Sequence, residues 1–216
     1  NTVKIRDAYK VYVNRLFTLA GYSAEEAAEA AKTVIDLETE IAKVSVDRAT
    51  RRDVHKNYNK MTVKEFTSRF DFIDWEVFFK ETGICKSEEL NASQVTFFEG
   101  LTKLLKNVSL EDQKDYLAFK LLNSAANYLS DDFVNASFDF YGKALQGKEE
   151  NQPRWKSSLA VVNRSLAEAF GQMYVEKYFP ASSKEKMLEM VANLQTALGE
   201  RIYALEWMSD ETKAKA

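Results

Sequence analysis

The chain has 216 residues, of which 45% are apolar and 12% aromatic, so it can bury a sizeable core as one large domain or two small ones. Its net charge of -3 does not favour a nucleic acid or an anionic membrane surface as partner, and no apolar run approaches the roughly 18 residues that span a bilayer. The single cysteine, Cys85, excludes an internal disulfide framework and a metal site with several cysteine ligands.

Helical patterns fill the N-terminal part of the chain. It contains only 7 Gly and 2 Pro, which favours long helices with few tight turns between them. Apolar residues in 3–20 recur at close to helical spacing, and Gly21 ends that predicted helix. Ser23-Ala24-Glu25-Glu26 is a capping box, and it predicts the start of a second helix that continues to about Val44.

Shorter elements are expected in the middle of the chain. Thr62-Val63-Lys64-Glu65 is another capping box, and Asp74 is a candidate N-cap for a further short helix. The run Val95-Thr96-Phe97-Phe98 is rich in β-prone side chains and is followed by Gly100. We therefore expect at most a minor β element, near residues 94–98.

Four longer helices are predicted in the second half. Ser109 opens the first, and Pro153 lies in the first turn of the third, where proline is tolerated. The last carries an apolar stripe on one face. The expected ranges are 109–128, 131–146, 151–178 and 183–205.

These patterns predict a mainly α fold, a multi-helix arrangement in one domain over residues 1–216. Ser209 is a good N-cap, and the residues after it, 212–216, favour helix without any stop signal. Asn1 is not an initiator methionine, and helical pattern begins within a few residues of it. We therefore expect the chain to be a piece of a longer protein, truncated at both ends.

The residues offer little catalytic chemistry. One histidine, His55, lies in a polar run, so a zinc site built on a histidine pair cannot form within this chain. Cys85 would need a histidine and a third group to act as a nucleophile, and we read it as a bystander. The 7 glycines are scattered singly, which excludes a glycine-rich phosphate loop. We assign no catalytic, cofactor-binding or metal-binding residue.

Two aromatic patches leave alternatives open. Phe138-Asp139-Phe140-Tyr141 is one, and Tyr174-Val175-Glu176-Lys177-Tyr178-Phe179 is the other. Both have spacings that suit a packed core, and a ligand-binding groove is the alternative.

Five segments in series resemble the neprilysin-like zinc endopeptidase family, which includes neprilysin, the endothelin-converting enzymes and the bacterial oligopeptidase O group. Their order and approximate spacing match over nearly the whole chain. The segments are Leu37-Glu38-Thr39-Glu40-Ile41-Ala42; Tyr58-Asn59-Lys60-Met61-Thr62 with Trp75; Phe140-Tyr141-Gly142-Lys143-Ala144-Leu145 with Gly147 and Arg154-Trp155; Gly171-Gln172-Met173-Tyr174-Val175 with Phe179, Ser183 and Lys184; and Trp207-Met208 with Thr212-Lys213 and Ala216.

The resemblance implies that this chain is the central part of a helical domain that caps a thermolysin-like catalytic domain. The two domains of the family enclose a cavity that admits peptides and excludes folded proteins. The zinc ligands belong to the catalytic domain, so the implied partners are that domain and peptide substrates of the parent enzyme, with no nucleic acid and no membrane contact from this segment. Zinc is expected in the parent enzyme and no cofactor in this piece. With a single cysteine, the chain resembles the bacterial members of the family, which favours the periplasm or another extracytoplasmic compartment.

A stand-alone helical interaction module remains the alternative, and it would need an exposed apolar groove. If the chain is instead a cap without its catalytic partner, one surface is expected to be unusually apolar for a monomer. We expect Trp207 and Met208 to be partly exposed on that surface, because tryptophan and methionine favour interface cores.

Overall fold

The computed structural model describes residues 2–84 and 87–216 of the chain. Its contacts group the residues into two compact units, 1–151 and 152–216, each described by itself. Within the described ranges the structure contains eleven α-helices and one two-stranded sheet, so the mainly α prediction is confirmed. The single-domain expectation for 1–216 stays a prediction.

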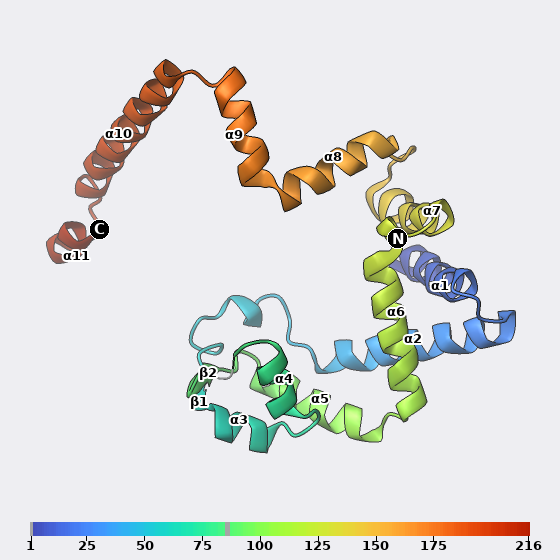
Figure 1. Ribbon diagram of the computed structural model, residues 1–216. Helices are drawn as coiled ribbons and strands as arrows, with labels where there is room; N and C mark the ends of the chain where they lie inside the picture. The colour runs from blue at the N-terminus through green and yellow to red at the C-terminus, as the bar shows by residue number, and fades with distance from the viewer. Residues whose placement is uncertain (1, 85–86) are drawn as a thin grey trace. The chain divides into compact units, whose positions relative to one another are not determined.

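The first unit begins with two long helices (Figure 1). They are α1, Thr2–Leu19, and α2, Ala24–Val44. Gly21 lies between them with φ 97°, a left-handed conformation that glycine adopts at little cost. Ser23 caps α2 as predicted: its hydroxyl accepts from the Glu26 amide at 3.3 Å, and the Glu26 carboxylate accepts from the Ser23 amide at 2.9 Å.

A small module follows α2 in the first unit. Its elements are the 3₁₀ turn η1, Thr50–Arg52; the strands β1, Lys60–Thr62, and β2, Glu89–Asn91; and the helices α3, Val63–Arg69, α4, Trp75–Glu81, and α5, Val95–Asn107. The strands pair antiparallel with Met61 opposite Leu90. The predicted caps Thr62 and Asp74 are confirmed, because their side chains accept from the amides of Glu65 and Val77.

The minor β element that the sequence allowed at 94–98 does not form, because these residues enter α5. Aromatic packing accounts for the difference. The ring of Phe98 lies 5.1 Å from that of Phe66 and 5.3 Å from that of Phe70, in a cluster that also takes in Val95. Strand propensity is a weak preference that tertiary packing overrides.

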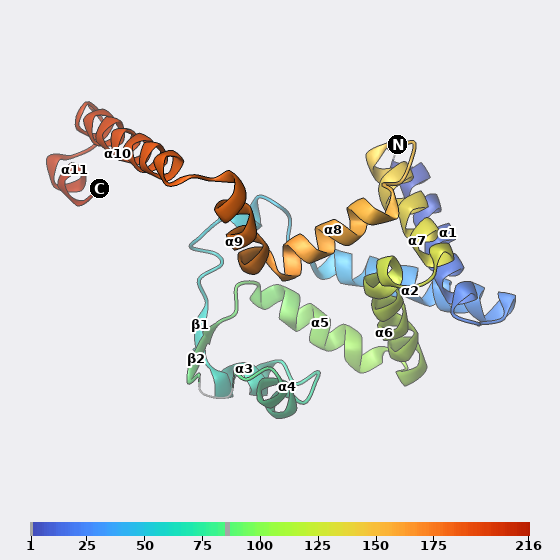
Figure 2. The same cartoon turned by 45° about the horizontal axis from the view of Figure 1, so that its top comes forward.

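The remaining elements of the first unit return along α1 and α2. They are α6, Leu110–Ala125; the 3₁₀ turn η2, Ala126–Tyr128; α7, Asp131–Ser137; and a π-helix η3, Phe138–Ala144. Figure 2 shows α7 beside α1, and α6 crossing α2. Their shared core buries twelve side chains, which are Tyr12, Val13, Leu16, Phe17, Ala27, Ala30, Ala31, Val34, Phe119, Ala126, Ala136 and Phe140.

The helix predicted over 131–146 changes from α to π geometry at Phe138. Gly142 lies against the ring of that residue, and a Cβ at Gly142 would be 2.3 Å from two ring carbons. Glycine is therefore required by this close approach.

The second unit contains α8, Arg154–Ser165; α9, Ala167–Tyr178; α10, Ala181–Tyr203; and α11, Asp210–Lys215. The continuous helix expected over 151–178 is wrong, because Leu166 has φ −127° and ψ 33° and separates α8 from α9. No glycine or proline marks this break in the sequence. Ser209 caps α11, as predicted.

Candidate interaction surface

The second unit has helices but no buried core. Among its residues, 152–216, none is buried, whereas the first unit holds every buried side chain of the described chain. Helices of 12 to 23 residues are stabilised in proteins mainly by packing of an apolar face. Its apolar faces are therefore not covered within the unit itself.

Each long helix of this unit presents an apolar stripe at helical spacing. Tyr174 and Tyr178 of α9 lie one turn apart, with ring centroids 5.3 Å from each other. The exposed apolar surface of the second unit consists of Trp155, Leu159, Val162, Leu166, Phe170, Met173, Tyr174, Val175, Tyr178, Met187, Leu188, Met190, Val191, Leu194, Leu198, Tyr203 and Trp207. Solitary exposed apolar residues are normal, but a set of this size marks an interaction site.

The expectation for the C-terminal end is confirmed. Trp207 is 77% exposed and Met208 is half-buried, so neither is enclosed within the chain. The two aromatic patches behave differently from each other. Phe140 of the first patch is buried in the core, as predicted, whereas Tyr174 and Tyr178 of the second are exposed.

The segments that carry the family resemblance divide in the same way. Leu37 and Phe140 are buried and Trp75 packs in the aromatic cluster of the small module, so these serve the core of the first unit. Trp155 and Met173, from the segments of the second unit, are 63% and 67% exposed. The sequence signal was the same for both groups, because an amphipathic stripe does not reveal which surface covers it.

Two residues were considered for catalysis, and neither was assigned a catalytic role. His55 is exposed on the loop between α2 and β1, and Cys85 lies outside the described residues. Over residues 2–84 and 87–216 no three His, Cys, Asp or Glu side chains are grouped so that they could hold a metal ion. The lone exposed histidine does not fit a zinc site, which needs three or four ligands.

The most strongly perturbed titratable groups are two tyrosines in the first unit. Burial raises the pKa of Tyr12 to about 12. Burial, together with a hydrogen bond to Glu38, raises the pKa of Tyr9 far above its ordinary value. Both hydroxyls stay protonated at neutral pH and act as hydrogen-bond donors. Tyr9 donates to Glu38 at 2.7 Å, and Tyr12 donates to Asn123 at 2.7 Å. They stabilise helix packing and provide no general base near neutral pH.

Comparison with known proteins identifies the family. The N-terminal model of peptidase family M13 matches residues 1–216. The chain belongs to peptidase family M13. This confirms the resemblance to the neprilysin-like zinc endopeptidases.

Relatives within peptidase family M13 match the whole chain but extend beyond it. An endothelin-converting enzyme homolog of Locusta migratoria is 30% identical over 99% of this chain and 31% of its own length. A neutral endopeptidase of Lactobacillus helveticus is 28% identical over 99% of this chain and 33% of its own. The chain therefore spans about a third of the relatives that it matches.

A solved structure from the family shares the fold. The zinc metalloprotease ZMP1 of Mycobacterium tuberculosis, in complex with an inhibitor, matches with a TM-score of 0.86 and 28% identity. The match covers 97% of this chain and 32% of that protein. The helical chain thus corresponds to about a third of that zinc metalloprotease.

No described helix is both long enough and apolar enough to cross a membrane.

Proposed function

We propose that this chain is the helical capping region of a zinc-dependent metalloendopeptidase that cleaves peptides. In this role it forms a rigid wall of the substrate cavity, and a catalytic domain elsewhere in the parent protein holds the zinc and the general base. The observation that carries the proposal is the second unit, whose helices expose apolar stripes and bury no side chain.

The chemistry of the chain supports this division of labour. Its one histidine is exposed and isolated, so the chain supplies shape and contact surface, and the zinc ligands must come from elsewhere. The relatives that it matches, an endothelin-converting enzyme homolog and a neutral endopeptidase, are about three times as long. A binding module with no peptidase parent is disfavoured, because the family match extends over residues 1–216.

The test compares the 216-residue chain with the complete parent protein. The parent is expected to cleave an internally quenched fluorogenic peptide, to lose that activity to a chelator and to regain it with zinc. The chain alone is expected to retain no stoichiometric zinc after dialysis and to cleave nothing. Chelator-sensitive cleavage by the isolated chain would contradict the proposal, as would a parent without peptidase activity.

Substrate size provides a second test of the wall. The parent is expected to cleave short peptides and to leave intact a folded protein that contains the same peptide sequences, because an enclosed cavity excludes the folded protein. Equal rates on the folded and the short substrate would argue against a capping role.

We further propose that the parent acts outside the cytoplasm. The support for this is family resemblance. Fractionation of source cells, with detection by an antibody against this chain, would decide it, and recovery in the cytoplasmic fraction would refute it.

A further inference from the structure

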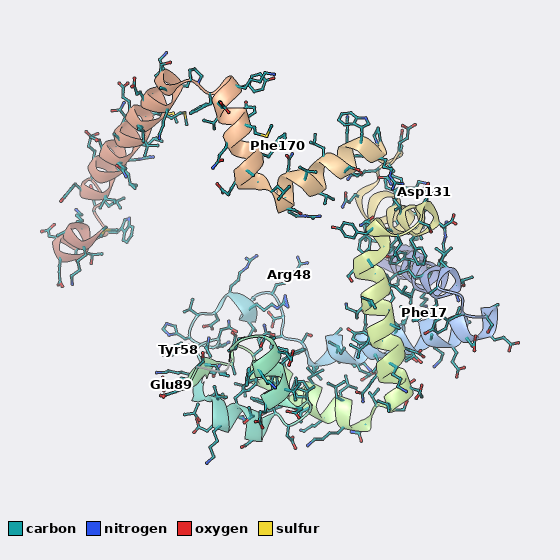
Figure 3. The ribbon with its side chains drawn as sticks, viewed as in Figure 1. Phe17, Arg48, Tyr58, Glu89, Asp131 and Phe170 are labelled. Carbon is teal, nitrogen blue, oxygen red and sulfur yellow. The ribbon has the colours of Figure 1, made fainter. Side chains whose placement is uncertain are left out.

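The loop between α2 and β1 is basic, although the chain as a whole is acidic. Residues 47–59 carry four basic and two acidic side chains, whereas the chain has a net charge of -3. Arg48, Arg51 and Arg52 lie within five residues of each other and are all exposed. Figure 3 labels Arg48 on this loop. The positive charge is therefore local, on an otherwise negative protein.

The acidic residues of the loop do not neutralise these arginines. The Asp47 carboxylate accepts from the Ala49 amide at 2.8 Å and from the amide and hydroxyl of Thr50 at 2.9 and 2.8 Å. These hydrogen bonds, those from Thr50 above all, hold the pKa of Asp47 below its ordinary value. Asp53 accepts from the Lys56 amide at 3.1 Å and pairs with its ammonium at 3.7 Å.

The three guanidinium groups lie on a loop whose backbone is held by hydrogen bonds. None of them forms an ion pair or a side-chain hydrogen bond with a described residue. Asn57 closes the loop by donating to the carbonyls of Thr50 and Asp53 at 2.9 and 2.6 Å. The loop backbone that carries these arginines therefore loses less conformational freedom on binding a ligand than a flexible tail would.

Arg51 borders a hollow of about 410 Å³ in the first unit. The other lining residues come from the end of α2, from β2 and the segment after it, and from the start of α5. They are Ile41, Ser45, Asn91, Ser93, Gln94, Phe97 and Phe98. Phe97 and Phe98 are half-buried, so aromatic faces line part of the hollow. Amide and hydroxyl side chains provide its polar lining.

A second hollow of about 230 Å³ adjoins it and shares Ser93 and Gln94. Asn57, Asn59, Thr50 and Lys56 are among its lining residues. The amide nitrogens of Asn57 and Asn59 already donate to backbone carbonyls of the loop. Gln94, which lines both hollows, carries an amide that can bond the N–H and the C=O of an extended backbone. The two hollows together therefore combine an amide side chain and an aromatic ring with a nearby cation.

We propose that this pair of hollows binds a peptide segment that carries a carboxylate next to an apolar side chain, with Arg51 on the carboxylate and Phe97 beside the apolar group. A planar guanidinium matches a carboxylate with two parallel hydrogen bonds. A nucleic acid is a poorer fit, because three arginines on one turn do not form a basic stripe and the protein is acidic overall. The peptide class follows from the proposed function and deepens it.

The carboxylate could belong to the C-terminus of the peptide or to an acidic side chain, and three labelled probes separate these sources. The first peptide ends in alanine-phenylalanine as the free acid, the second is its C-terminal amide, and the third is that amide with a glutamate before the phenylalanine. Fluorescence anisotropy with the 216-residue chain gives the Kd of each. Binding of the first or the third probe, at least about tenfold tighter than the second, is expected.

Variants locate the contact. Arg51→Gln is expected to raise the Kd of the preferred acidic probe at least about tenfold, while Arg6→Gln, an exposed arginine of α1 outside both hollows, leaves it within about twofold. Equal affinity for all three probes, or equal effects of the two substitutions, would overturn the proposal. Circular dichroism of both variants keeps loss of folding from being counted as loss of binding.

The same substitution in the complete parent separates this inference from the proposed function. With these peptides as substrates, Arg51→Gln is expected to raise the KM of the parent for whichever of the first and third peptides binds more tightly, and to leave kcat unchanged. No effect is expected on cleavage of the second peptide. A parent without peptidase activity would refute the proposed function, yet the binding measurements on the 216-residue chain would still decide the site. An active parent with unchanged binding by Arg51→Gln would refute the site alone.

Discussion

The hydroxyl of Tyr12 donates a 2.7 Å hydrogen bond to Oδ1 of Asn123, a residue 111 positions further along the chain. The hydroxyl of Tyr141 donates to the same oxygen at 3.1 Å. One amide thus joins α1, α6 and the π-helix η3. The stacked rings of Tyr12 and Phe140, whose centroids are 5.3 Å apart, lie beside it.

Asn123→Ala is expected to destabilise the first unit by about 1–3 kcal/mol, because two tyrosine hydroxyls lose their shared acceptor. Urea unfolding monitored by circular dichroism gives the free energy of unfolding. Asn127→Ala, at an exposed position of η2, is the matched control, and a change within about 0.5 kcal/mol is expected there. Equal losses in the two variants would show that Asn123 contributes no more than an exposed amide.

Two glycines in helices are predicted to respond in opposite directions to alanine. A Cβ at Gly100 of α5 would lie 2.6 Å from two side-chain carbons of Val44 in α2, whereas nothing lies within 4 Å of a Cβ at Gly199 in α10. Gly199→Ala is expected to increase helix stability by up to about 1 kcal/mol, since alanine is the better helix former. Gly100→Ala is expected to lower the stability of the first unit, because the steric overlap outweighs that gain.

Val44→Ala in the Gly100→Ala background tests this explanation. Alanine removes Cγ1 of Val44 but keeps Cβ, which is itself 2.6 Å from the added carbon, so the double variant is expected to recover only part of the loss in the free energy of unfolding. If the second substitution only adds a further loss, the close approach of α2 and α5 is not the cause. Because both helices border the hollow beside Arg51, Gly100→Ala is also expected to weaken binding there.

The local capping chemistry of this fold was predictable from the sequence, and the long-range pairing was not. Each capping box, at Ser23 and at Thr62, is complete within four residues, so both hydrogen-bonding side chains can be recognised in the local sequence. The two-stranded sheet was missed because each strand has three residues and the register, Met61 opposite Leu90, joins segments 29 positions apart. The helical state of Phe98 likewise depends on its distant neighbours Phe66 and Phe70.

The candidate surfaces were predictable only in part. Trp207 was expected to be exposed from its place beside Ser209, but the absence of buried side chains throughout residues 152–216 could not be read from amphipathic stripes. The basic loop is visible in the sequence at Arg48, Arg51 and Arg52. Its hollow is not, because the lining comes from three segments that only the fold brings together.

Alkaline pH is expected to destabilise the first unit through its buried tyrosines. Burial raises the folded-state pKa of Tyr12 from 10.0 to about 12. The unfolded state therefore loses this proton first, so the stabilising contribution is complete below about pH 10 and is lost as pH rises towards 12. The fall in unfolding free energy between pH 9 and 12 is expected to be steeper in the natural chain than in Tyr12→Phe. Parallel curves would show that Tyr12 does not contribute.

Trp207 provides the last test, because it reports directly on the surface proposed to contact the catalytic domain. Its side chain is 77% exposed in this chain, and the other two tryptophans, Trp75 and Trp155, can be replaced by phenylalanine to leave it as the sole indole. Acrylamide is expected to quench this indole efficiently in the 216-residue chain and several-fold less in the complete parent, where an interface excludes the quencher. A matched variant that retains only Trp155 examines α8 in the same way, and Trp75, which packs in the aromatic cluster of the first unit, is expected to be shielded equally in both proteins. If Trp207 and Trp155 are quenched as strongly in the parent as in the isolated chain, the apolar stripes of the second unit are not covered by the catalytic domain, and the capping role proposed for them fails even though family membership stands.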